Sequence, residues 1–178
     1  MRLQCFDLVA NKFQKEADSK AKIELGAPKA QNKWDIYIEQ SKIDDSTNVF
    51  VSTTSLEPVS ARFNRNTQPR LTLRCLENKT AAVLIFDGMF MSDIQGYGEV
   101  TFRVDKKKAF VKKMQASTDN QALGLFSGGA AIPFIKTLFD GNTLLVKVTP
   151  YNESPVMFSF NIEGIEEALI PLRQACKW

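Results

Sequence analysis

Histidine is absent from the 178 residues of this chain. This absence excludes Ser-His-Asp and Cys-His nucleophile systems, zinc sites with imidazole ligands, and acid–base catalysis by imidazole. It does not exclude carboxylate-based hydrolysis, but no paired catalytic acid and base is evident in the sequence. Nucleotide-binding, EF-hand and nucleophile-elbow motifs are also missing. The sequence therefore predicts no cofactor, no metal ion and no enzyme activity.

Cysteine is scarce, with Cys5, Cys75 and Cys176 far apart and no C-x-x-C pair. This spacing argues against a zinc knuckle or a thioredoxin-type redox site. Because the number is odd, at most one intrachain disulfide can form. Two readings stay open from the residues alone: three buried thiols in a reducing compartment, or one long-range bridge with one cysteine left over.

An excess of one charge and a long apolar run are missing as well. The 23 Lys and Arg against 20 Asp and Glu give a net charge of only +3, so no nucleic-acid partner is expected. No stretch is long and apolar enough to be a transmembrane segment, and residues 1–20 lack the apolar core of a signal peptide. If Met1 is the native start, the sequence predicts a cytoplasmic protein; a leader removed before Met1 would leave the same sequence.

Most of the chain shows the alternation of apolar and polar residues that is typical of β-strands. The alternating segments are short and are separated by turn clusters rich in Asp, Asn, Gly and Ser. They lie at 34–39, 49–54, 71–76, 81–86, 100–104, 110–116, 144–148 and 156–162. The sequence therefore predicts a mainly β fold, an antiparallel β-sandwich or partly open barrel.

Three segments have helical spacing instead. Residues 1–32 predict an N-terminal amphipathic helix and a polar tether, which precede a β-sandwich domain over 33–178. A second helix is predicted over 130–139. A third is predicted at the C-terminal end, where apolar residues recur at helical spacing over 165–172 and Pro171 predicts a kink or break.

Two arginines stand out because each lies mid-strand on the face opposite its apolar neighbours. One interpretation is that Arg74 and Arg103 form a polar groove with Asp105, Ser117 and Asp119. Such a groove would bind a protein partner or a small anionic ligand. The alternative is cross-strand ion pairing on a solvated surface, which strand surfaces carry routinely and which contributes about 0.2–1 kcal/mol per pair.

A series of short blocks spans nearly the whole chain in a recognisable order. The blocks are 2–7 (RLQCFD), Trp34 with 41–46 (SKIDDS), 71–80 (LTLRCLENKT), 100–105 (VTFRVD), 117–119 (STD), 132–135 (IPFI), 149–152 (TPYN) and 172–178 (LRQACKW). Each block is weak alone, but together and in this order they resemble the VasI/TagO family associated with type VI secretion.

The resemblance implies an exported, non-enzymatic accessory protein that engages a protein or cell-envelope partner, in the periplasm if a leader was removed. It also implies that Cys75 and Cys176 form a disulfide with Trp178 covering the junction, that Cys5 lacks its usual upstream partner, and that Asn78 joins the candidate binding residues. Related sequences also occur in phages and prophages. The alternative is therefore a phage-encoded cytoplasmic protein that binds a host protein or sequesters a small anionic ligand, and so antagonises host defence.

Overall fold

The computed structural model describes residues 34–60, 67–93 and 95–178, and the predicted N-terminal helix and tether over 1–32 lie outside them. The described residues form nine strands in one sheet, in which neighbouring strands are all antiparallel. The strands are β1 (Asp35–Gln40), β2 (Thr47–Thr54), β3 (Arg70–Leu76), β4 (Lys79–Ile85), β5 (Tyr97–Val104), β6 (Phe110–Ala116), β7 (Ala122–Leu125), β8 (Thr143–Val148) and β9 (Val156–Asn161). The helices are α2 (Gly128–Lys136), α3 (Ile165–Ala168) and α4 (Ile170–Cys176). The prediction of a mainly β, antiparallel fold is confirmed.

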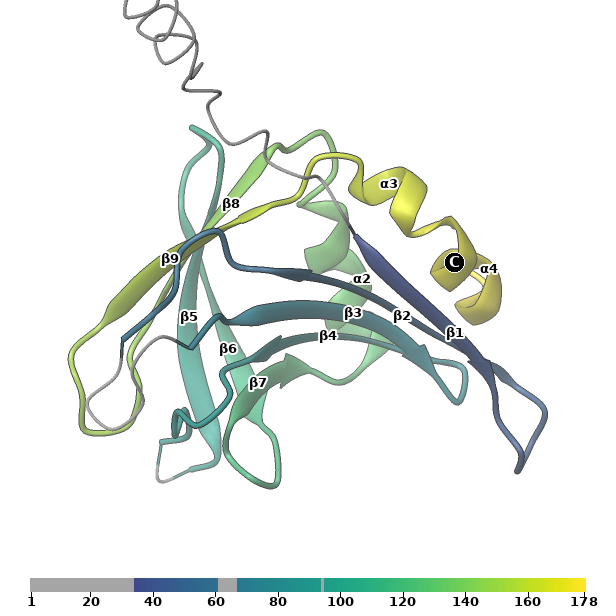
Figure 1. The fold of residues 1–178 in the computed structure, drawn as a ribbon, viewed down its shortest axis with the longest axis horizontal. Helices are drawn as coiled ribbons and strands as arrows, with labels where there is room; N and C mark the ends of the chain where they lie inside the picture. The colour runs from purple at the N-terminus through teal and green to yellow at the C-terminus, as the bar shows by residue number, and fades with distance from the viewer. Residues whose placement is uncertain (1–33, 61–66, 94) are drawn as a thin grey trace, which may run out of the picture. The chain divides into compact units, whose positions relative to one another are not determined.

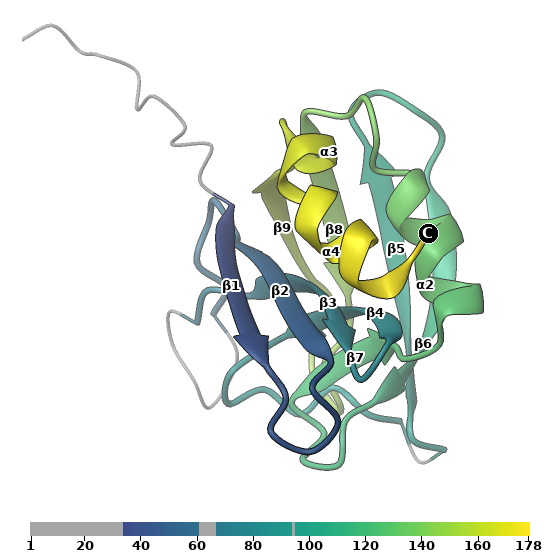
Figure 2. The same cartoon turned by 90° about the vertical axis from the view of Figure 1, so that its right-hand side faces the viewer.

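The sheet is strongly bent but does not close into a barrel. Its strand order is β1-β2-β3-β4-β7-β6-β5-β8-β9. In Figure 1, β1 to β4 form one wall, and β5, β8 and β9 form a second wall that crosses it steeply. The three helices lie together on one side, over the space between the two walls (Figure 2).

The segment that follows β2 covers the free edge of β9. The backbone N–H of Leu56 donates a hydrogen bond of 2.8 Å to the carbonyl oxygen of Ser159. The Glu57 carboxylate accepts hydrogen bonds from the backbone N–H of Ser159, at 2.9 Å, and from its hydroxyl. These contacts tie the two walls together at one end of the molecule.

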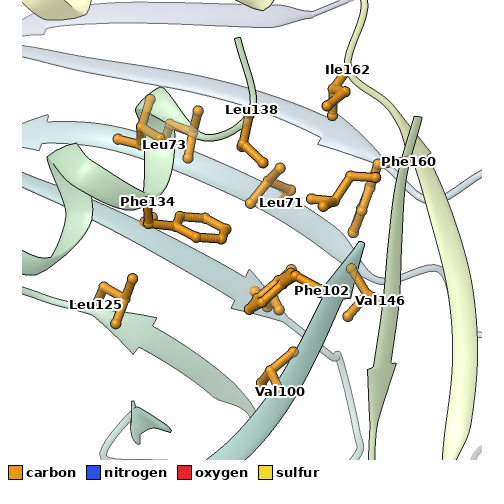
Figure 3. Close-up of a cluster of buried hydrophobic side chains, with 14 of the residues drawn as sticks. Leu71, Leu73, Val100, Phe102, Leu125, Phe134, Leu138, Val146, Phe160 and Ile162 are labelled. Carbon is orange, nitrogen blue, oxygen red and sulfur yellow. The ribbon is translucent and has the colours of Figure 1, made fainter. Parts of the chain in front are cut away.

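The hydrophobic core fills the space inside the bend. Figure 3 shows Leu71 and Leu73 of β3 pointing toward Phe134 of α2 and Phe102 of β5. All four side chains are at most 1% exposed, and the rings of Phe102 and Phe134 have centroids 4.8 Å apart. The face of the sheet that carries these residues is called the inner face below, and the opposite face is called the outer face.

The predicted helices are present with shifted ends. The helix predicted over 130–139 is α2, and it begins two residues earlier, directly after Ser127. The C-terminal helix is broken as Pro171 predicts: α3 ends at Ala168 and α4 begins at Ile170, with Pro171 in its first turn. A proline fits there because the first-turn N–H groups have no partner inside the helix.

A disulfide joins Cys75 of β3 to Cys176 at the end of α4. The two Cα atoms are 5.7 Å apart, and Cys75 is fully buried on the inner face. The expected pairing is therefore confirmed. Trp178 packs against the same core, and its ring lies 5.5 Å from the guanidinium carbon of Arg173. The covalent bond thus holds the C-terminal helix against the first wall, near the end of β3.

Candidate functional site

A pocket of about 500 Å³ lies on the outer face, where β3, β4, β7 and the end of β6 run side by side. We call it the outer-face pocket. It is lined by Arg74, Val83, Ile85, Asp87, Gln115, Ala116, Ser117, Thr118, Asp119, Gln121, Ala122 and Phe126. The pocket combines an apolar floor with one cation at one end and a polar turn at the other.

Small residues in register create the hollow. Val83 of β4 faces Gly124 of β7, which in turn faces Gln115 of β6. Two further small side chains, Ala81 and Ala122, lie in the same layer and are less than 9% exposed. Because these side chains are short, they form the floor of the pocket, and the larger residues around them form its walls.

Arg74 forms the cationic end of the pocket. It faces Ala81 across the strand pair, and its guanidinium carbon lies 5.9 Å from the centre of the Phe126 ring. The Phe126 ring covers Gly124, where any Cβ would overlap it. The Nε atom of Arg74 is shielded from solvent and has no hydrogen-bond partner among the described residues. A buried donor without an acceptor is unfavourable. Because Arg74 as a whole is partly exposed, its terminal nitrogens are the donors that a ligand in the pocket can reach.

The opposite end is the turn between β6 and β7. The Ser117 hydroxyl donates to the Asp119 carboxylate and accepts from the backbone N–H of Ala122 at 3.0 Å. Asp119 also accepts from the backbone N–H of Gln121 at 3.1 Å, and the Gln121 side chain accepts from the backbone N–H of Gly88. The hydrogen bond from Ser117, and then that from Gln121, hold the pKa of Asp119 below its ordinary value. Asp119 is therefore an anion fixed within a rigid turn.

Arg103 and Asp105 lie elsewhere on the sheet. Arg103 lies near the end of β5 remote from Tyr97, and Asp105 directly follows that end, whereas Tyr97 faces Gln115. The six residue steps from Tyr97 to Arg103 correspond to roughly 20 Å along the strand. Arg103 Nε donates to the carbonyl oxygen of Lys107 at 3.2 Å. The predicted five-residue groove is therefore split, and only Arg74, Ser117 and Asp119 share the outer-face pocket.

Asp105 and Asn78 hold turns. The Asp105 carboxylate accepts hydrogen bonds from the backbone N–H groups of Asn142, at 3.2 Å, and Thr143, at 2.8 Å, which fixes the chain before β8. Asn78 and Glu77 connect β3 to β4 with positive φ angles of 59° and 49°. Two positive φ angles in a two-residue hairpin loop define a type I′ turn, which asparagine tolerates well.

The sequence interpretation missed Phe126, Val83 and Gln115 as pocket residues. A signal for the first was available: Gly124 interrupts the short apolar run of β7, and a strand glycine often marks a close approach by another group. No local pattern could place Gln115, because its position depends on the pairing of β6 with β7, two strands that are joined by an irregular turn.

The arrangement suits binding better than proton transfer. A guanidinium stays charged at all physiological pH values and supplies a planar set of donors. The Ser117 proton is held by Asp119, and a carboxylate with a lowered pKa is a weak base and is deprotonated at neutral pH. Within the described residues, no three metal-ligating side chains gather closely enough to hold an ion. None of the described helices has the length and apolar character needed to cross a bilayer.

Comparison with known proteins adds two findings. A protein-family model described as "Type VI secretion system VasI, EvfG, VC_A0118" matches residues 1–178. Among solved structures, the chain is similar to the crystal structure of invasion associated protein B from Bartonella henselae, with a TM-score of 0.50 and 17% sequence identity over 82% of this chain and 94% of that one. At this identity the likeness concerns the fold alone. A search of curated proteins found no match.

Proposed function

Because the chain belongs to the VasI family of type VI secretion proteins, we propose that it is a periplasmic accessory protein that binds a protein partner through the outer-face pocket. The observation that carries the proposal is the position of Arg74: a partly exposed arginine, with its Nε shielded and unpartnered among the described residues, beside an apolar floor. Interface hot spots are enriched in arginine and aromatic side chains that sit in desolvated pockets. Arg74 and Phe126 form such a pair.

The disulfide supports the periplasmic part of the proposal. Disulfides persist in oxidising compartments such as the bacterial periplasm and are rare in the cytosol. The bond between Cys75 and Cys176 ties a core strand to the C-terminal helix, so it is part of the fold rather than a surface feature. A protein made from the full open reading frame in its native host is therefore expected to fractionate with the periplasm and to carry no free thiol at Cys75 or Cys176. Reduced cysteines in a cytoplasmic fraction would contradict the proposal and favour the phage-type alternative.

We propose a binding role and not an enzymatic one. Among the side chains that line the pocket, Asp119 has its pKa lowered by the hydrogen bond from Ser117. A lowered pKa moves this carboxyl group away from pH 7, whereas a catalytic acid or base is tuned toward it.

Complementation of a deletion strain tests the pocket. The strain would carry the wild-type gene, Arg74→Ala, or Arg70→Ala, and type VI activity would be measured as contact-dependent killing of a competitor. Arg70 is a matched control because it is an exposed arginine on the same face of the same strand, four residues from Arg74 and outside the pocket lining. We expect Arg74→Ala to reduce killing at least tenfold and Arg70→Ala to leave it unchanged. Full activity of a normally accumulated Arg74→Ala protein would refute the proposal.

A further inference from the structure

We propose that the outer-face pocket binds a carboxylate carried by a short, extended, apolar peptide segment, with the Arg74 guanidinium as the direct partner of the carboxylate. This inference rests on the proposed function and specifies the chemistry of the partner. The carboxylate has two possible sources in a protein, the C-terminus and an acidic side chain, and the experiment below distinguishes them.

The geometry around Arg74 matches a bidentate carboxylate. The Phe126 ring lies 5.9 Å from the guanidinium carbon, and the Nε donor is shielded and lacks an acceptor within the described part of the chain. A carboxylate that approaches a guanidinium end-on accepts one hydrogen bond from each of the two terminal nitrogens. These are the atoms of Arg74 that a ligand can reach, because the side chain is partly exposed while its Nε is shielded. A ring beside the guanidinium restricts the side chain, which lowers the entropy lost on binding.

The apolar floor next to Arg74 is the surface on which the apolar residues of the peptide would pack. Val83 and Ile85 extend from Arg74 toward the turn at Ser117, and both line the pocket. Arg74 faces Ala81, whereas Ile85, four residues further along β4, faces Ala122 of β7. Four residues of strand span about 13 Å, which is the length of an extended segment of about four residues. The pocket thus has room for a peptide with its carboxylate at Arg74.

The far end of the pocket favours a peptide over a polyanion. Asp119 is fixed there as an anion, and Ser117, Thr118 and Gln121 present polar groups around it. A nucleic acid or polyphosphate would place further negative charge close to Asp119, and like charges at short range repel. A peptide instead presents N–H groups, which are natural donors to a carboxylate. One cation at one end, with the carboxylates of Asp87 and Asp119 also in the lining, therefore favours a ligand whose single negative charge lies at the Arg74 end.

Three synthetic peptides test the inference on the full chain in its oxidised form. The first is acetyl-Leu-Val-Ala-Leu with a free C-terminal carboxylate, the second is the same peptide with a C-terminal amide, and the third is acetyl-Leu-Val-Glu-Leu-amide. Binding is followed by calorimetry and by the NMR signals of the arginine Nε–H groups. We expect the first or the third peptide to bind at least tenfold more tightly than the second, with a shift of the Arg74 Nε–H signal. Tighter binding of the first indicates a C-terminal carboxylate, and tighter binding of the third indicates an acidic side chain.

Two variants separate recognition from simple charge attraction. Arg74→Lys keeps the positive charge but removes the planar pair of donors, so affinity for the preferred peptide should fall at least tenfold. Arg70→Lys makes the same change at an exposed position outside the pocket and should have no effect. Equal affinity for all three peptides, no binding of any of them, or unchanged affinity of Arg74→Lys would each overturn the inference. The comparison of the three peptides needs no variant, so it stands even if Arg74→Lys folds poorly.

The outcomes also distinguish this inference from the proposed function. If Arg74→Ala abolishes type VI activity and no carboxylate peptide binds, the pocket is functional but its ligand has another chemistry. If a carboxylate peptide binds and Arg74→Ala supports full activity, the carboxylate chemistry holds and the proposed role in secretion fails.

Discussion

Reduction of the Cys75–Cys176 disulfide should destabilise the protein strongly. The two cysteines are 101 positions apart, so the bond closes a loop that includes most of the described domain. In the chain-entropy estimate, a loop of about 100 residues contributes about 4.7 kcal/mol to the free energy of unfolding, and loss of a native disulfide typically costs 2–5 kcal/mol. For a domain of this size each kcal/mol corresponds to about 2–4 °C in melting temperature. We therefore expect a fall of about 10–15 °C.

Circular dichroism melts of the same preparation, with and without reductant, measure this effect. Reduction is preferred to Cys75→Ala, because truncating a fully buried side chain would add a packing loss of its own. Cys5→Ala serves as the thiol control: it keeps the Cys75–Cys176 pair and should show the same fall on reduction. A change of less than about 3 °C, with complete reduction verified by mass spectrometry, would refute the loop-entropy reasoning, since it corresponds to only about 1 kcal/mol.

Three further predictions concern single side chains of the outer face and its turns. Gly124→Ala should lower the free energy of unfolding by about 1–3 kcal/mol in a urea titration, because the new Cβ would displace the Phe126 ring. Strand propensity alone would predict a more stable variant, so an increase in the free energy of unfolding would contradict this reasoning. Asp105→Ala should cost about 2 kcal/mol in the same assay, because two backbone N–H groups before β8 lose a charged acceptor. Ser117→Ala should raise the pKa of Asp119 toward its ordinary value of 3.8, as measured by carboxyl NMR titration. Because the folded pKa is depressed, the ionised Asp119 stabilises the fold above its unfolded pKa, and this stabilisation is lost as the pH falls through the lower, folded pKa.

Local features of the fold could be predicted well from the sequence. Alternation identified the inner face of β3 correctly, since Leu71, Leu73 and Cys75 are all at most 1% exposed. Pro171 marked the break between α3 and α4 because its ring and missing N–H act within one turn of the helix. Such effects depend on neighbours in the chain, so they can be read without knowledge of the tertiary structure.

β1 shows where alternation misleads. Ile36 and Ile38 alternate with polar residues, which predicts a half-buried strand, yet they are 47% and 52% exposed. The reason is tertiary: β1 is the edge of the sheet, and α4 packs mainly over β2 and β3. No property of the β1 sequence reports how far a distant helix extends across the sheet.

The candidate site was predicted only in part for a related reason. Alternation indicates the face on which Arg74 and Arg103 lie, and both do lie on the outer face. It does not indicate their position along that face, which depends on the register between strands far apart in the sequence. The strand order places β7 and β6 between β4 and β5, so Ser117 comes close to the β3–β4 pair while Arg103 stays at the remote end of β5.

The disulfide also divides the chain into two mechanical parts. The segment from Cys75 to Cys176 is a covalent ring that contains β4 to β9 and all three described helices, whereas β1 and β2 precede it. If the protein were pulled by its two ends, the force would pass through the bond and could not extend the ring. At about 3.5 Å per residue, the 75 residues up to Cys75 give a maximum extension of about 260 Å, against about 620 Å for the reduced chain. A tension that strips the β1–β2 hairpin would therefore leave the ring closed, with the helices that it contains still joined to β3.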